Sequence, residues 1–105
     1  MDKEMILSSG NVFADLGLPD AGGLMVKADL MAQIQAAMER KGLTQKQLAD
    51  LVGLDQPKIS KLLRGQFGGF SIDRLFFILN RLGHEVQVHI DSTEREDAQT
   101  LILAA

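Results

Sequence analysis

Apolar residues recur at helical spacing through the middle of the chain, and glycines interrupt the pattern at intervals. The first repeat recurs every three or four positions and comprises Leu30, Ile34, Ala37 and Met38. Side chains at this spacing share one face of a helix, which should face a core. The pattern predicts a helix that begins near residue 20 or 21 and runs to Lys41, with Gly42 in the terminating position.

Two shorter helices are expected next, on either side of a turn at Gly53. Thr44 and Gln47 have the T-x-x-Q spacing of a capping box, which starts a helix at about residue 45. Asp55 can cap the following helix. Pro57 is tolerated in its first turn because the N–H that proline lacks has no partner there. This helix should end near residues 64 and 65.

A glycine-rich loop, GQFGGF, precedes a fourth expected helix. Ser71 should cap it, Asp73 in the first turn suits the helix dipole, and Gly83 should end it. Phe76 and Phe77 are adjacent, so they cannot share one face of a helix. We expect one of them to face the core and the other to face outward or contact a partner.

The period changes to two in the segment HEVQVHI, residues 84–90, which predicts a β-strand. Its apolar face would consist of Val86, Val88 and Ile90. A single strand leaves its N–H and C=O groups unpaired, so we expect it to pair with its own copy in a homodimer, as an intermolecular two-stranded sheet. The competitor for this edge is a strand over residues 100–103, although the tail also fits a helix capped by Thr93.

The expected organisation is an N-terminal arm over residues 1–20, a helical domain over 21–83, a dimerisation strand over 84–91 and a tail over 92–105. The fold class is therefore mainly α, with four or five helices and a C-terminal strand. A chain of 105 residues with 46% hydrophobic and 24% charged residues suits one small domain.

Several classes of function are disfavoured. The chain has no cysteine, which excludes disulfides and thiolate chemistry, and it has neither a membrane-length apolar run nor a signal-peptide core. We therefore expect a cytoplasmic protein. His84 and His89 would lie on opposite faces of a strand, so they cannot share a metal. No catalytic signature is found, and we expect neither an enzyme nor a cofactor.

Charge is distributed unevenly. Residues 40–81 carry eight basic and three acidic side chains, a net charge of +5, so the remainder carries −8 of the total of −3. This asymmetry indicates a basic working surface flanked by acidic segments.

The segment LTQKQLADLVGLDQPKISKLLRG, residues 43–65, satisfies several constraints at once. Ala49 is small where two helices would cross, and Gly53 permits a left-handed turn. The positions that would pack the two helices at a steep angle are Leu48, Val52, Leu54, Ile59 and Leu62. The pattern predicts a helix-turn-helix.

With Ile59 in the core, the 100° helical step places a polar set on the opposite face: Pro57, Ser60, Lys61 and Arg64. Gln56 begins the same helix, where recognition helices reach base edges. Glutamine can pair with adenine and lysine with guanine, and Gln45 begins the preceding helix, where phosphate can bind. Any one of these residues is also compatible with simple solvation, but the set on this frame favours DNA binding.

The same segment resembles the XRE family, which includes the phage lambda and 434 repressors and Cro proteins, over roughly residues 30–83. This resemblance implies a lambda-repressor-like DNA-binding domain. The flanks SSGNVFADLGLPDA, RGQFGGFSIDRLFFILNRLG and HEVQVHI resemble HigA-like antitoxins. That family implies a homodimer that represses its own operon by binding palindromic operator DNA and that neutralises a RelE/HigB-like mRNA-cleaving toxin.

By that resemblance, Gln45 takes a phosphate-contacting position, and Gln56, Pro57 and Lys61 take base-facing positions. The residues that flank or extend this surface are Lys58, Arg64, Gly68, Gly69 and Ser71. Pro57 departs from the usual polar residue and can offer only apolar contact, for example to a thymine methyl.

Two partner surfaces are expected, the first from the unpaired strand and the outward phenylalanine, the second from the resemblance. The dimer interface would comprise Phe76, Phe77, Val86, Val88 and Ile90. The toxin contact would lie in the N-terminal arm at Val12, Phe13, Asp15 and Leu16, and the second candidate is the segment over residues 91–105, with four acids and the apolar run LILAA. Two other functions stay open: an XRE-family regulator without a toxin, and a protein-binding adaptor on the same fold.

Overall fold

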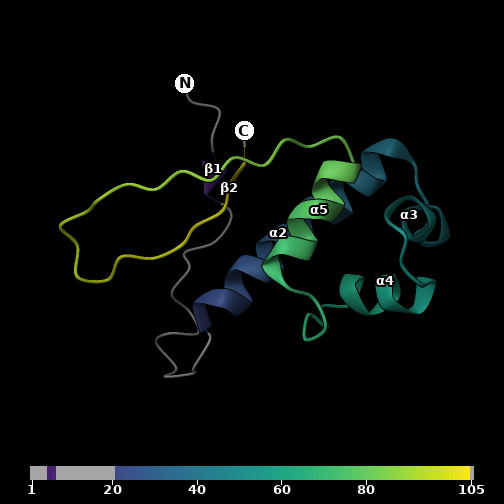
Figure 1. The fold of residues 1–105 in the computed structure, drawn as a ribbon, viewed down its shortest axis with the longest axis horizontal. Coiled ribbons are helices and arrows are strands. Elements are labelled where there is room, and N and C mark those ends of the chain that lie inside the picture. The colour runs from purple at the N-terminus through teal and green to yellow at the C-terminus, as the bar shows by residue number, and fades with distance from the viewer. Residues whose placement is uncertain (1–4, 7–20, 105) are drawn as a thin grey trace.

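Four helices form the body of the described part of the chain, which comprises residues 5–6 and 21–104 of a computed structural model (Figure 1). Helix α2 spans Ala21–Lys41 and α5 spans Ile72–Arg81, and these two pack side by side. Helices α3 (Gln45–Val52) and α4 (Gln56–Leu63) pack together at one end of that pair. All four expected helices are therefore present within a residue or two of their expected bounds.

Two of the three expected N-cap residues form the expected side-chain hydrogen bond, and the third does not. The hydroxyl of Thr44 accepts from Gln47 N at 3.1 Å, and the Thr44 N–H donates to Gln47 Oε1 at 2.8 Å, which completes the capping box of α3. The hydroxyl of Ser71 accepts from Arg74 N at 3.1 Å. Asp55 occupies the N-cap position of α4, but its side chain makes no capping hydrogen bond, so that expectation was only half right.

Helix ends depend on glycine. Gly53 has φ 75° at the end of α3, and Gly83 has φ 89° just after α5. Around Gly83 two backbone bonds close the helix, from Gly83 N to Asn80 O at 3.0 Å and from His84 N to Leu79 O at 2.9 Å. This is the Schellman arrangement, whose left-handed residue favours glycine because it carries no Cβ.

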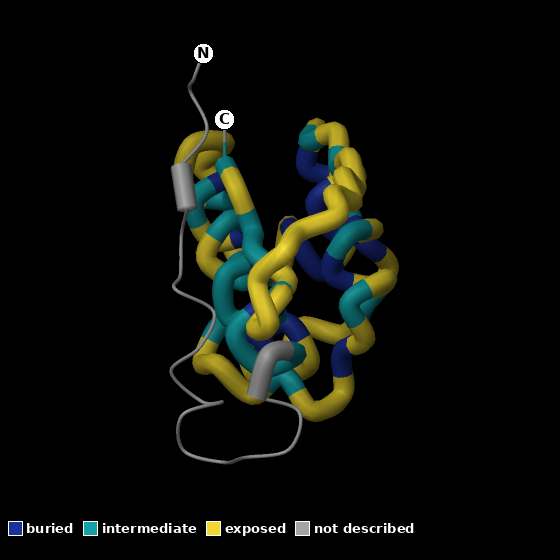
Figure 2. Tube along the Cα trace, turned by 90° about the vertical axis from the view of Figure 1, so that its left-hand side faces the viewer, coloured by how far each residue is buried: buried dark blue, intermediate teal, exposed yellow. Residues whose placement is uncertain are grey.

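Buried residues occur in all four helices (Figure 2) and form one apolar core. Among the described residues, no polar side chain is buried. The largest fully buried side chains are Ile34, Leu48, Ile59, Leu62, Leu75, Ile78 and Leu82. Of the residues expected to line the first helix, Leu30, Ile34 and Ala37 are buried and Met38 is half-buried. The helical repeat therefore identified the core face of α2 correctly.

The strand expected over residues 84–90 does not form within the described single chain. Strand β2 (Leu103–Ala104) instead pairs antiparallel with β1 (Met5–Ile6), with Met5 opposite Ala104. Within the described ranges, residues 84–90 have no neighbouring strand to share their backbone hydrogen bonds, and a strand needs one. The tail residues 92–104 also form no helix, so that alternative was wrong.

None of the helices in the described ranges combines the length and the apolar character that crossing a bilayer requires.

Candidate nucleic-acid interface

Helices α3 and α4 form a helix-turn-helix whose inner faces are closed. Leu48, Ala49 and Val52 of α3 are buried, as are Ile59 and Leu62 of α4. In the turn, the N–H of the half-buried Leu54 donates to Ala49 O at 3.0 Å. All the positions expected to pack the two helices are therefore at least half-buried, and the outer face of α4 is fixed by this packing.

The outer face of α4 carries the polar and basic set predicted from the sequence. Gln56, Pro57, Lys58, Lys61 and Arg64 are exposed, and Ser60 is half-buried. The ion pairs between described residues join Lys46 to Asp50, His89 to Asp91 and Arg95 to Asp97. The cations of α4 therefore have no carboxylate partner in the described part of the chain, and their charge is available to a ligand.

One contact on this face was not foreseen. Arg64 Nη1 donates to Ser60 Oγ at 2.6 Å, one helical turn away. The bond holds the guanidinium along the helix and restricts the side-chain freedom that would otherwise be lost on binding. The i, i+4 spacing of the two residues is the sequence signal that could have predicted it.

The neighbouring elements contribute polar backbone rather than charge. Gln45 begins α3, and the loop of Gly68 and Gly69 leads from α4 into α5. Neither glycine has a positive φ, and a Cβ on either would meet nothing within 4 Å. The fold therefore does not require glycine here, and the open space allows another backbone to come close. The Ser71 hydroxyl already accepts the capping bond but retains its own O–H to donate.

The residues expected at the dimer interface differ in how far the single chain buries them. Phe76 is half-buried against the core, whereas Phe77 is 49% exposed, so the expectation that these two would differ was right. Val86 also packs on the core, while Val88 and Ile90 are 72% and 88% exposed. The toxin-contact candidates Val12, Phe13, Asp15 and Leu16 lie outside the described residues.

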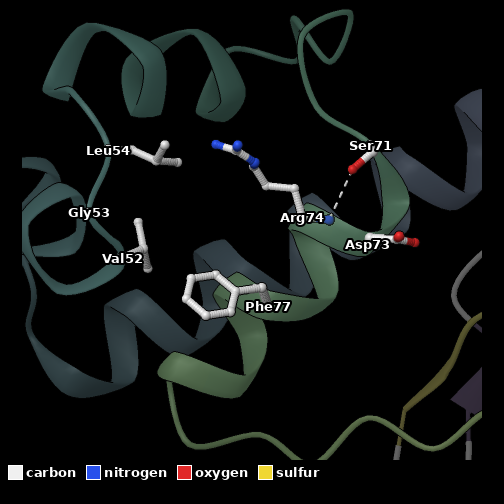
Figure 3. Close-up of a pocket in the computed structure, with 7 residues that line it drawn as sticks. All are labelled: Val52, Gly53, Leu54, Ser71, Asp73, Arg74 and Phe77. Atoms are coloured by element: carbon white, nitrogen blue, oxygen red, sulfur yellow. Dashed lines mark hydrogen bonds between the residues drawn. The ribbon is translucent and has the colours of Figure 1, made fainter.

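Two further features of this region were missed by sequence reasoning. Arg81 Nε donates to Leu51 O at 3.2 Å and so ties α5 to the end of α3. Between the same helices lies a pocket of about 430 Å³ with Val52, Leu54 and Phe77 among its lining (Figure 3). These contacts join residues far apart in sequence, and no local sequence pattern predicts them.

Titration and metal chemistry add little to the site. Burial raises the pKa of Asp29, a half-buried carboxyl on α2 rather than on the basic face. No group of three or more potential metal-ligating side chains occurs among the described residues. The site therefore presents hydrogen-bond donors and positive charges on one helix, α4.

Comparison with known proteins agrees with this geometry. A family model described as a helix-turn-helix domain matches residues 12–91. A solved structure described as an XRE-family transcriptional regulator is 34% identical, with a TM-score of 0.71, over 80% of this chain and 94% of that one. No curated protein matches the sequence significantly.

The fold and the exposed basic helix define a helix-turn-helix domain of the lambda-repressor type. The chain belongs to the XRE-type helix-turn-helix family, a class of DNA-binding transcription regulators.

Proposed function

We propose that the protein is a dimeric repressor that binds a palindromic operator at its own promoter through α4. The observation that carries the proposal is the row of exposed cations on α4 and its C-cap, opposite the buried face, which have no carboxylate partner among the described residues. Unpaired lysine and arginine attract the phosphate backbone, and a helix held with its outer face free can enter the major groove.

The residues of this surface divide by role. Gln56, at the start of α4, can pair with adenine, and Lys61 can donate to guanine O6 and N7. Pro57 offers an apolar contact to a thymine methyl. Gln45 at the start of α3 and the amides of Gly68 and Gly69 suit phosphate, which would fix the register of the helix without reading sequence.

Dimerisation would follow from residues 84–91. The exposed Val88 and Ile90 and the absence of a strand partner in the described chain support antiparallel pairing with a second copy. Aspartate at both positions should lower the fraction of dimer in sedimentation experiments. A fully dimeric double variant would refute this part of the proposal.

Footprinting on the promoter region at several salt concentrations tests DNA binding. We expect protected half-sites about one helical turn apart, and Lys61→Ala should cost roughly 1–3 kcal/mol of specific binding. Arg95→Ala is the matched control, because it removes one positive charge from the loop that lies at the far end of the molecule from α4 (Figure 1). Lack of protection at low salt would contradict the proposal.

We further propose that the protein neutralises a RelE/HigB-like toxin encoded beside it. The net charge of −8 outside residues 40–81 suits a basic, RNA-binding partner, and the HigA-like flanks point the same way. The N-terminal arm, with its apolar and acidic residues, is the preferred contact. Its ordering entropy would have to be outweighed by those apolar contacts.

A pull-down of the adjacent gene product tests this second role. The full chain should capture it, and a chain without residues 1–20 should not, whereas a chain without 92–105 should. If both deletions bind equally well, the arms are not the contact. If no toxin-like gene product binds, a regulator without a toxin is the better description, and loss of DNA binding as well would favour an adaptor.

A further inference from the structure

The pocket between α3 and α5 combines apolar side chains with a guanidinium that has no partner among the described residues (Figure 3). Val52 and Leu54 line it from the end of α3 and the turn, and the ring of Phe77 lines it from α5. At 49% exposure Phe77 is among the most solvent-accessible large apolar residues of the described helices. The pocket therefore presents an uncovered apolar surface immediately beside the turn that leads into α4.

The cation is Arg74. Its side chain reaches across the pocket towards Leu54, whereas the carboxylate of Asp73 points away from it (Figure 3). Its backbone N–H donates to Ser71 Oγ, and within the described ranges its guanidinium has neither a hydrogen bond nor an ion pair. A group that fills this pocket would thus combine an apolar side chain with an adjacent carboxylate.

The chain itself carries that combination at Ile90 and Asp91. Ile90 is 88% exposed, more than any other large apolar residue described. One oxygen of Asp91 contacts His89 Nε2 at 3.0 Å, but both side chains are largely exposed and such pairs contribute little. The carboxylate therefore has a free oxygen to offer to a guanidinium.

Within one chain the two features stay apart. The segment over residues 84–91 leaves the end of α5 and runs towards β1 and β2, away from α3 and α4 (Figure 1). Ile90 and Asp91 are not among the residues that line the pocket. Ile90 and Asp91 could therefore enter such a pocket only in another copy of the chain.

We propose that the α3–α5 pocket receives Ile90 of a second copy of this chain, with Asp91 of that copy paired to Arg74. Two-fold symmetry makes the exchange reciprocal, so each dimer gains two apolar insertions and two ion pairs. The proposal rests on the homodimer of the proposed function and specifies its contacts. Because Gly53 and Leu54 line the pocket, the contact would also fix how the two α4 helices are oriented to each other.

A charge exchange in the full-length chain tests the pairing. Arg74→Glu and Asp91→Arg should each raise the dimer dissociation constant, measured by sedimentation, by roughly tenfold or more, because like charges then meet in the interface. The double variant Arg74→Glu/Asp91→Arg should return to within roughly threefold of the unmodified chain. Glu94→Arg, the same change of charge in the same exposed segment, is the control and should have no effect.

Each outcome decides the proposal. Rescue by the double variant supports it, and failure of rescue overturns it, as does an unchanged dimer with either single variant. If Val88→Asp weakens the dimer but the charge exchanges do not, strand pairing is supported and the pocket contact is rejected. An unmodified chain that stays monomeric overturns the homodimer together with the pocket, while footprinting on a single half-site still reports separately on DNA binding. Urea unfolding of each variant checks that the fold is retained.

Discussion

Arg81 and Leu51 are joined by a hydrogen bond of 3.2 Å, from the guanidinium Nε of one to the backbone carbonyl of the other. The carbonyls in the last turn of a helix have no partner within the helix, so this bond satisfies one that α3 leaves open. It also links the helix-turn-helix to α5 across 30 residues of sequence.

Replacing Arg81 by Met should remove this bond while keeping much of the apolar stem. We expect a loss of about 1 kcal/mol in the free energy of unfolding, the usual net value of one such hydrogen bond. Urea denaturation measures it. Lys58→Met, at an exposed position with no ion pair in the described part of the chain, should change stability much less, and an equal loss in the two variants would show that the bond to Leu51 does not stabilise the fold.

Thr44 and Asp55 offer a matched test of helix capping. Thr44→Ala should cost about 1 kcal/mol of stability, because the hydroxyl caps Gln47 N at 3.1 Å. Asp55→Ala should cost clearly less, since the Asp55 side chain makes no capping bond. Thermal unfolding of both variants provides the comparison, and a larger loss for Asp55→Ala would contradict it.

Gly68 and Gly69 should separate folding from DNA binding. Alanine at either position should leave the free energy of unfolding within about 0.5 kcal/mol of the original, because the φ angles are not positive and the Cβ meets nothing within 4 Å. The same change should weaken operator binding if the DNA backbone approaches closely. Gly53→Ala is the contrasting variant: its φ of 75° makes alanine strained, so stability itself should fall. Undiminished binding by both loop variants would remove the loop from the interface.

Asp29 gives a pH-dependent prediction. Burial raises its pKa in the folded chain above the usual 3.8, so the folded state holds its proton more tightly than the unfolded state. Stability contributed by this group is therefore present below pH 3.8 and decreases as the pH rises through the folded pKa. Asp29→Asn should accordingly be more stable than the original at pH 7, with no such gain at acid pH. Unfolding curves at both pH values test the sign.

The sequence was sufficient for features that depend on neighbours in the chain. Capping by Thr44 and Ser71 and termination at Gly53 and Gly83 depend on residues within a turn of each helix end, and the structure confirms them. Asp55 shows the limit of that reasoning, because a residue type suited to capping need not direct its side chain to the helix.

Features that depend on tertiary contact could not be obtained in the same way. Alternation over residues 84–90 indicates a tendency to extend, but a strand forms only where another strand supplies hydrogen bonds. Arg81 meets Leu51, and Phe77 approaches Val52, only after α5 has packed on α3. In the candidate site, the exposed face of α4 was predictable, and the i, i+4 spacing of Ser60 and Arg64 allows their bond, which also requires a particular side-chain rotamer.

The pairing of β1 with β2 has a consequence for the order of folding. Ile6 and Leu103 pair although they lie 97 positions apart in the sequence, whereas the contacts within the helix-turn-helix close over a few residues. Closing a long loop costs more chain entropy than closing a short one, and among the described residues the sheet that offsets this cost has two residues in each strand. The two ends of the chain should thus join last and separate first, and hydrogen exchange should find their amides open while the amides of α3 and α4 remain protected.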